Sequence, residues 1–168
     1  MVLHPSSSHE QQSAERLILG AVSLHLGSKV TPRRVDLPGG AYVNVDGVAD
    51  EPPVFVEVYA HQGRLRGGQR HKIAGDILKL LTLGKAHPGA RLVLAFADIE
   101  VAGQVQNKGW LAEAIRTWSV EVFVADLPVE VREGLRAAQG RQVMVNPPSG
   151  TDPVSVDPVD PEEDFGGV

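Results

Sequence analysis

The sequence predicts an α/β domain in which helices flank a mixed central sheet. Two observations carry this prediction. Three strand-like segments, separated by turn signals, follow an amphipathic N-terminal helix pattern, and further strand-like segments then alternate with helical periodicities. An antiparallel meander that continues into β-α-β crossovers gives a mixed sheet with helices on both faces. The expected core order is α-β-β-β-α-β-α-β, followed by a last helix, and 168 residues suffice for one such domain.

The first helix is expected over residues 9–26. The serine run at residues 6–8, followed by Glu10, offers a capping box, and Gly27 stands just past the expected end. Glu15 lies inside the apolar stripe of this helix. The stripe consists of Ala14, Leu17, Ile18, Ala21 and Val22.

Three strands are expected next, over residues 30–37, 41–48 and 54–60. Pro32 restricts the first of them to a sheet edge or to the beginning of a strand. The last of the three is an apolar run, which predicts a buried strand. The remaining elements are a helix over 69–85, a strand over 90–97, a helix over 104–118, a strand over 120–125 and a helix over 129–139.

Charge divides the chain into three parts. Residues 1–8 are expected to be a flexible N-terminus, residues 9–146 the folded domain, and residues 147–168 a disordered acidic tail. The tail holds six acids and no Lys or Arg, so the net charge of −5 becomes +1 for residues 1–146. Residues 61–97 hold seven Lys or Arg and a single acid, a local excess that suits a polyanion or a solvated charged face.

Asp46 and Glu57 are the candidate metal-binding pair. They lie eleven positions apart on neighbouring expected strands, with a turn between them. Glu57 stands in an apolar strand, where a carboxylate is costly unless it is paired or binds a cation. Two converging carboxylates suit Mg²⁺ or Mn²⁺. The alternative is that Glu57 pairs with a nearby Lys or Arg and that Asp46-Gly47 is turn chemistry.

A polar stripe on the second helix adds to this pair. Gln69, Lys72, Asp76 and Lys79 fall at i, i+3, i+7 and i+10, on one side of the helix next to its apolar face. A surface ladder of ion pairs is the alternative, and it fits Lys79 better than Lys72. Lys72 is expected nearer the acids because the start of the helix should face the edge to which Glu57 points.

In element order, and in Asp46, Glu57 and the helix that opens Gly68-Gln69-Arg70-His71-Lys72, the chain resembles the PD-(D/E)XK, or restriction-endonuclease-like, superfamily. The resemblance covers roughly residues 9–126. It implies that Glu15, Asp46 and Glu57 are metal ligands, with Glu10 as the alternative to Glu15. It also implies that Gln69 is the helix glutamine found in some branches of the superfamily.

The chain departs from the superfamily at Glu57-Val58-Tyr59, where Glu-x-Lys is expected. Tyr59 cannot supply the positive charge of that lysine. Some branches move the lysine to the following helix, which makes Lys72 the first candidate and Lys79 the second.

The resemblance implies a Mg²⁺- or Mn²⁺-dependent nuclease that acts on DNA rather than RNA. The absence of cysteine predicts a reducing, cytoplasmic location. Glu15, Asp46, Glu57, Gln69 and Lys72 would form its catalytic site. The expected nucleic-acid contacts are Arg64, Arg66, Arg70, His71 and Lys79.

Two alternatives stay open: a non-catalytic nucleic-acid-binding or assembly member of this superfamily, and an unrelated α/β interaction domain with structural carboxylates. No apolar run is long enough to predict a membrane span. A homodimer is compatible with these features, and the acidic tail offers a segment for a protein partner. Trp110 and Trp118 are expected in the core rather than as base-stacking platforms.

Overall fold

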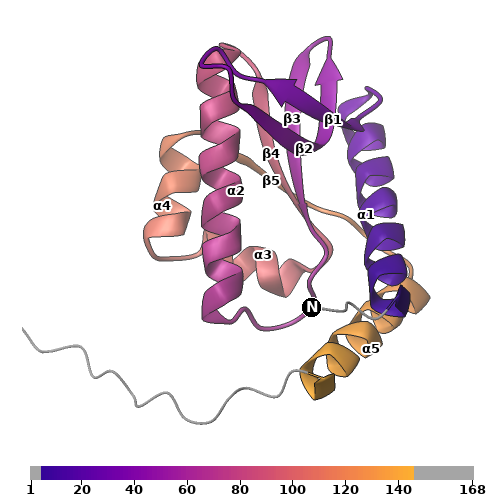
Figure 1. The fold of residues 1–168 in the computed structure, drawn as a ribbon. Coiled ribbons are helices and arrows are strands. Elements are labelled where there is room, and N and C mark those ends of the chain that lie inside the picture. The colour runs from indigo at the N-terminus through magenta and orange to yellow at the C-terminus, as the bar shows by residue number, and fades with distance from the viewer. Residues whose placement is uncertain (1–4, 146–168) are drawn as a thin grey trace, which may run out of the picture.

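A five-stranded mixed sheet with helices on both faces forms the protein (Figure 1). The structure is a computed structural model, and it describes residues 5–145. The elements in chain order are α1 (Pro5–Leu26), β1 (Thr31–Asp36), β2 (Tyr42–Asp50), β3 (Pro53–Tyr59), α2 (Gly67–Ala86), β4 (Arg91–Phe96), α3 (Ile99–Gln106), α4 (Trp110–Thr117), β5 (Glu121–Val124) and α5 (Val129–Val145). The predicted α/β class with a mixed, helix-flanked sheet is confirmed; the acidic tail expected over 147–168 lies outside the described residues.

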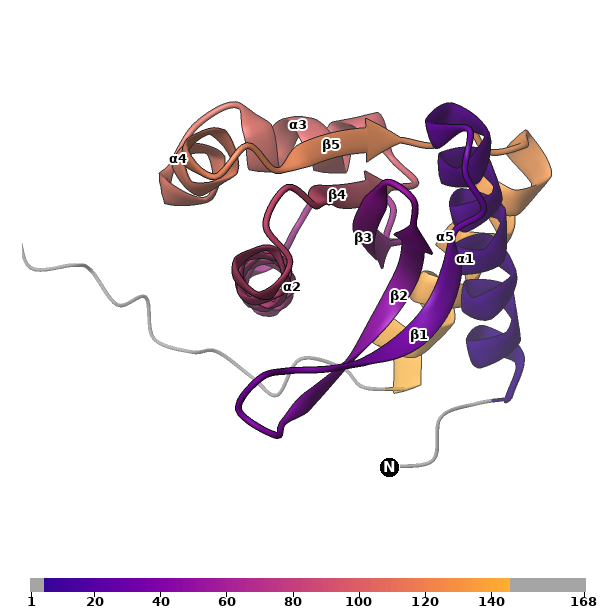
Figure 2. The ribbon, with the colours of Figure 1, turned by 90° about the horizontal axis from the view of Figure 1, so that it is seen from above.

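The strand order in the sheet is β1-β2-β3-β4-β5. The first three strands pair antiparallel, whereas β3, β4 and β5 are parallel. The two crossovers from β3 to β4 and from β4 to β5 step in the same direction. Because such connections are right-handed, their helices α2, α3 and α4 lie on one face of the sheet, and α1 and α5 cover the other (Figure 2).

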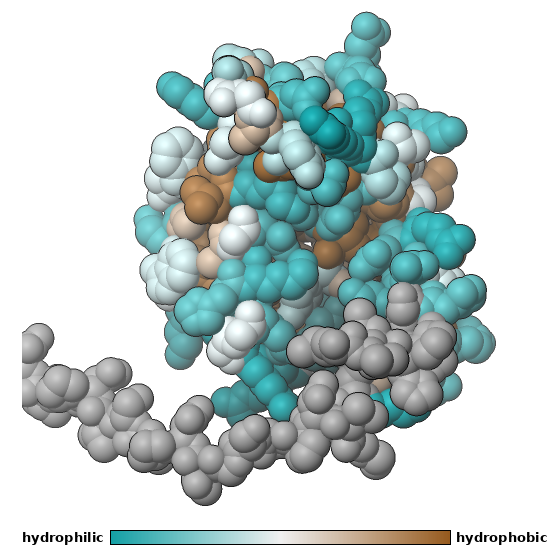
Figure 3. All heavy atoms as spheres, in the orientation of Figure 1, coloured by the Kyte–Doolittle hydropathy of each residue, from teal (hydrophilic) through white to brown (hydrophobic). Residues whose placement is uncertain are grey.

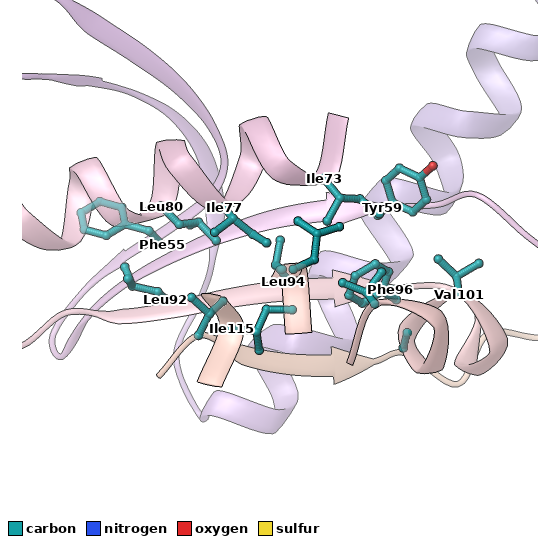
Figure 4. Close-up of a cluster of buried hydrophobic side chains, with 14 of the residues drawn as sticks. Phe55, Tyr59, Ile73, Ile77, Leu80, Leu92, Leu94, Phe96, Val101 and Ile115 are labelled. Carbon is teal, nitrogen blue, oxygen red and sulfur yellow. The ribbon is translucent and has the colours of Figure 1, made fainter. Parts of the chain in front are cut away.

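Each face of the sheet has its own core. Figure 4 shows the core under α2, α3 and α4, in which Phe55 and Tyr59 of β3 meet Ile73 and Ile77 of α2. The opposite core joins Ile18 of α1 to residues of the parallel strands and to α5. Among the described residues, no helix is both long and apolar enough to cross a membrane.

The helix predicted over residues 104–118 is wrong as a single element. Two helices, α3 and α4, occupy this part of the chain, and α3 begins at Ile99, where the Asp98 side chain accepts a hydrogen bond from the Glu100 N–H. Gly109 separates them with a φ of 93°, in the left-handed region that favours glycine. The apolar spacing continues across the break because both helices pack on the same core.

The tryptophans are a second correction, because neither is a core residue. Trp110 is 68% exposed at the start of α4, and Trp118 is 60% exposed just after its end. The core positions of α4 are instead taken by Leu111, Ala112 and Ile115. The two tryptophans flank this apolar stripe. Their position next to it in the sequence was therefore not sufficient to predict that they are buried.

A bulge in β2 carries one of the candidate acids. Thr31 of β1 pairs with Val48 and Arg33 pairs with Val45, so Asp46 and Gly47 together lie opposite one residue. An extra residue interrupts the alternation of a strand and redirects the side chains next to it. Accordingly Val45 and Val48, three positions apart, both belong to the core under α2.

The bulge leaves no room for a side chain at position 47, which is occupied by Gly47. A Cβ at this position would overlap a Val30 methyl group and come within 2.8 Å of Leu19 Cδ2. Gly47→Ala should therefore destabilise the protein by about 1–3 kcal/mol, the usual cost of overpacking. Urea denaturation measures this change. Gly75→Ala is the matched control, since a Cβ on that helical glycine meets nothing within 4 Å; equal stability of the two variants would contradict the close packing at the bulge.

Candidate metal centre

Glu57 is the buried charge at the centre of the candidate site. Its residue is 2% exposed on β3, between Phe55 and Tyr59 on the face that α2 covers. Lys79 Nζ donates a hydrogen bond of 2.6 Å to Oε2. The other oxygen, Oε1, is buried and has no hydrogen-bond partner among the described residues. Burial, and next the negative charge of Asp46, raise the pKa of Glu57 to about 7, while the Lys79 hydrogen bond opposes the rise.

Asp46 lies beside Glu57 at the point where β2 and β3 stop pairing. The antiparallel ladder runs from Asp50–Pro53 to Gly47–Val56, and Asp46 and Glu57 are the next residues on the two strands. Asp46 Oδ2 accepts a hydrogen bond of 2.9 Å from the Val58 N–H. The carboxylate thus takes the place of a backbone acceptor and is fixed at the open end of the ladder.

Glu15 approaches Asp46 from α1. Its Oε1 accepts a hydrogen bond of 3.1 Å from Gln11 Nε2, one turn earlier on the helix. Partial burial raises the pKa of Glu15, the Gln11 hydrogen bond lowers it, and the charge of Asp46 raises it further. Asp46 therefore acts electrostatically on both Glu15 and Glu57 and stands at the centre of the three acids.

Lys79, rather than Lys72, is the lysine that contacts Glu57. Lys79 Nζ also donates to the Asn44 carbonyl oxygen at 3.2 Å, so it joins β2 to β3. Lys72 instead forms the i, i+4 ion pair with Asp76 at 2.8 Å, and its Nζ lies 5.5 Å from the Tyr59 ring centroid. Asp76 is only 9% exposed and also lies 3.9 Å from Lys79.

Helix and strand geometry explain why the second candidate lysine reaches Glu57. The chain leaves β3 at Tyr59 and returns along it in α2, where Lys72 lies beside the Tyr59 ring. Glu57 is two strand residues further back, or about 6.6 Å. The same distance takes roughly four residues of helix at 1.5 Å each. The contact therefore falls more than one turn beyond Lys72, within the reach of the long Lys79 side chain.

Gln69 caps α2. Its Oε1 accepts a hydrogen bond of 2.7 Å from the Arg66 N–H, and its Nε2 lies 3.1 Å from the ring nitrogens of His61. These bonds direct it to the start of the helix and away from the Glu57–Lys79 pair. The other predicted nucleic-acid contacts in this region are exposed: Arg64, Arg66, Arg70 and His71.

A pocket of about 320 Å³, here called the α5 pocket, opens beside the acids. Glu15, Asp46 and Lys72 line it, together with the end of β3 from Val58 to His61. Its far wall is α5, through Leu135, Ala138 and Gln139. Sequence reasoning did not find Gln139 as a part of the site. Gln139 contacts the His61 ring from 78 positions away, and no spacing pattern signals such a contact.

The side chains of this site can be compared with the ligands that a metal ion requires. In the part of the chain that the structure describes, no group of three or more Asp, Glu, His or Cys side chains is arranged as a metal site. Mg²⁺, however, is usually held by one or two carboxylates, with waters and substrate phosphates as its other ligands. Asp46 and Glu57 supply such a pair, and the unpartnered Glu57 Oε1 is a free ligand atom. The residues therefore fit a hard divalent cation.

The fold and the site define an α/β protein with a buried, lysine-paired carboxylate site at the end of its β2–β3 ladder. No family model, no curated protein and no solved structure matches the chain.

Proposed function

We propose that the protein is a metal-dependent phosphodiesterase of the PD-(D/E)XK type that hydrolyses DNA. The observation that carries the proposal is Glu57: a buried carboxylate with one oxygen on Lys79 and the other unpartnered, directly beside Asp46. Asp46 and Glu57 are the proposed ligands of Mg²⁺ or Mn²⁺, with Glu15 as the third acid. Lys79 takes the role of the lysine that Tyr59 replaces.

The metal would polarise the phosphate and lower the pKa of the attacking water. The side chains around it would position the reactants. The Val58 N–H fixes the Asp46 carboxylate, and the Lys79 ammonium orients Glu57. Lys72 lines the α5 pocket and offers a positive charge to phosphate oxygens. Burial raises the pKa of Tyr59 to about 12, so its phenol stays protonated at neutral pH and does not serve as a base.

A non-catalytic nucleic-acid-binding protein is the second candidate. The observation that favours it is the same 2.6 Å ion pair, because Lys79 already neutralises Glu57 without any metal. The two candidates differ in metal binding. Calorimetry with Mn²⁺ should detect one or two ions per chain if Asp46 and Glu57 are ligands, and Asp46→Asn should remove this binding. A folded protein that takes up no Mn²⁺ favours the second candidate.

Cleavage of plasmid, linear duplex and single-stranded DNA in Mg²⁺ or Mn²⁺ tests the activity. Asp46→Asn and Glu57→Gln should each lower the rate by about 10² or more, since each removes a ligand charge at the reacting phosphate. Glu121→Gln is the matched control, because this acid lies on β5, away from the site, and pairs with Arg91. Rates in Asp46→Asn and Glu57→Gln that equal those of wild type and of the control would exclude the site.

A further inference from the structure

A second and larger hollow adjoins the candidate centre. Here called the arginine groove, it has a volume of about 590 Å³ and lies between α1 and the β1–β2 hairpin. Glu15 and Asp46 line both this groove and the α5 pocket. The two acids therefore stand at the junction of the two cavities.

Three arginines give the groove its charge: Arg16 of α1 and Arg33 and Arg34 of β1. Arg16 Nε donates to the Gln12 carbonyl oxygen at 3.2 Å, and its guanidinium forms no ion pair with a described residue. Arg34 lies over the ring of Tyr42, 3.9 Å from its centroid, and is 3.1 Å from Asp36. Arg33 is held in a bidentate pair by Asp50. Planar guanidinium groups of this kind suit phosphate oxygens.

The α5 pocket has a different chemistry beyond the shared acids. Apart from Lys72, its other lining residues are apolar or neutral: Gln11, Val58, Tyr59, Ala60, His61, Leu135, Ala138 and Gln139. Burial lowers the pKa of His61, which favours its neutral form. Apolar side chains interspersed with neutral hydrogen-bonding groups fit the face and the edge of a nucleobase better than a phosphate.

We propose that the two cavities bind one DNA strand across the acids, with its phosphates in the arginine groove and one unpaired base in the α5 pocket. This inference rests on the proposed function and names its substrate, single-stranded DNA or a frayed end. The pocket is walled by α1 through Gln11 and by α5 through Leu135, so a base can enter only outside a duplex. Unpairing costs a few kcal/mol in a duplex and nothing in a single strand.

Charge supports the same path for the strand. Glu15 and Asp46 repel a phosphate by themselves, and a bound divalent cation reverses the sign at the junction. The arginine groove supplies positive charge on one side of this junction, and Lys72 supplies it on the other. A strand that crosses the junction thus meets cations on both sides of the phosphate at the metal.

Binding without cleavage tests this proposal separately from the hydrolysis. Fluorescence anisotropy in Ca²⁺ compares a labelled single-stranded DNA oligonucleotide, a blunt hairpin duplex and the RNA of the same sequence. We expect the single-stranded DNA to bind about tenfold more tightly than the hairpin. Arg16→Ala and Arg34→Ala should each weaken binding about three- to tenfold and reduce its salt dependence. Arg116→Ala on α4, remote from both cavities, is the matched control.

Two substitutions close the α5 pocket from opposite walls. Ala138→Phe fills it from α5, and Gln11→Trp narrows it from the exposed face of α1, where folding is not at risk. Each should abolish the preference for the single strand. Ala137→Phe and Ser13→Trp, at exposed positions outside the pocket, should leave this preference unchanged.

The outcomes separate the two proposals. Equal or tighter binding of the hairpin or the RNA, or arginine variants that match Arg116→Ala, overturns the strand path. Single-strand binding with the expected variant effects, in a protein that cleaves no DNA, supports the strand path and contradicts the hydrolysis. Cleavage that depends on Asp46, with no single-strand preference, supports the hydrolysis and contradicts the strand path.

Discussion

Lys79→Met should destabilise the metal-free protein by about 3 kcal/mol or more and should reduce any DNA cleavage to background. Glu57 is 2% exposed, and Lys79 is its hydrogen-bond donor. Removing one partner of a buried ion pair leaves an uncompensated charge, which typically costs about 3–5 kcal/mol. Glu57 can escape part of this cost by taking up a proton, so the loss should be greatest at alkaline pH. Guanidinium denaturation in EDTA at pH 8 measures it.

Lys72→Met is the matched control for this change. Lys72 occupies the same face of α2, but its side chain is 55% exposed and its partner is Asp76. When Lys72 is removed, the nearly buried Asp76 still has Lys79 at 3.9 Å, so this variant should lose clearly less stability than Lys79→Met. A double variant with Glu57→Gln and Lys79→Met should recover most of the stability, because no charge is then left buried. Equal losses in the two single lysine variants, or no recovery in the double variant, would contradict the role of the pair.

Local patterns in the sequence were sufficient for most of the elements and for the central pair of acids. The buried strand around Glu57 and the adjacent Asp46 follow from apolar runs and turn signals, and the structure places these residues at the end of one ladder. The polar stripe of α2 also lies where the periodicity puts it, beside that ladder. Periodicity could not predict how far α2 is shifted along β3, because this shift depends on the path of the connecting loop. The shift determines that Lys79, and not Lys72, contacts Glu57.

Features that depend on contacts between residues far apart in the chain could not be predicted from the sequence. The bulge that redirects Asp46 appears only in the pairing of β2 with β1, and in the sequence Asp46-Gly47 is indistinguishable from an ordinary turn. The wall of the α5 pocket comes from a helix that begins more than seventy positions after Glu57. Gln69 had a fitting position for the site, yet the unsatisfied N–H of Arg66 at the helix start takes its side-chain oxygen.

The metal-free protein should lose stability as the pH rises from 5 to 8, and Glu57→Gln should remove the part of this loss that comes from Glu57. The pKa of Glu57 is about 7 in the folded protein and 4.5 without the surrounding structure. Between these values the folded state holds a proton that the unfolded state has released, so unfolding becomes easier as the pH rises through this window. The shift corresponds to a change on the order of 3 kcal/mol.

Denaturation in EDTA at several pH values checks this, with the difference between variant and wild type as the readout. Glu57→Gln should gain stability relative to wild type steadily up to about pH 7. Glu121→Gln is the control with the opposite sign, since the Arg91 hydrogen bonds lower the pKa of Glu121 and its contribution is lost only as the pH falls below the window. If the stability difference between Glu57→Gln and wild type does not change with pH, Glu57 stays ionised throughout this range. The interaction with Lys79 would then outweigh the burial that raises the pKa of Glu57.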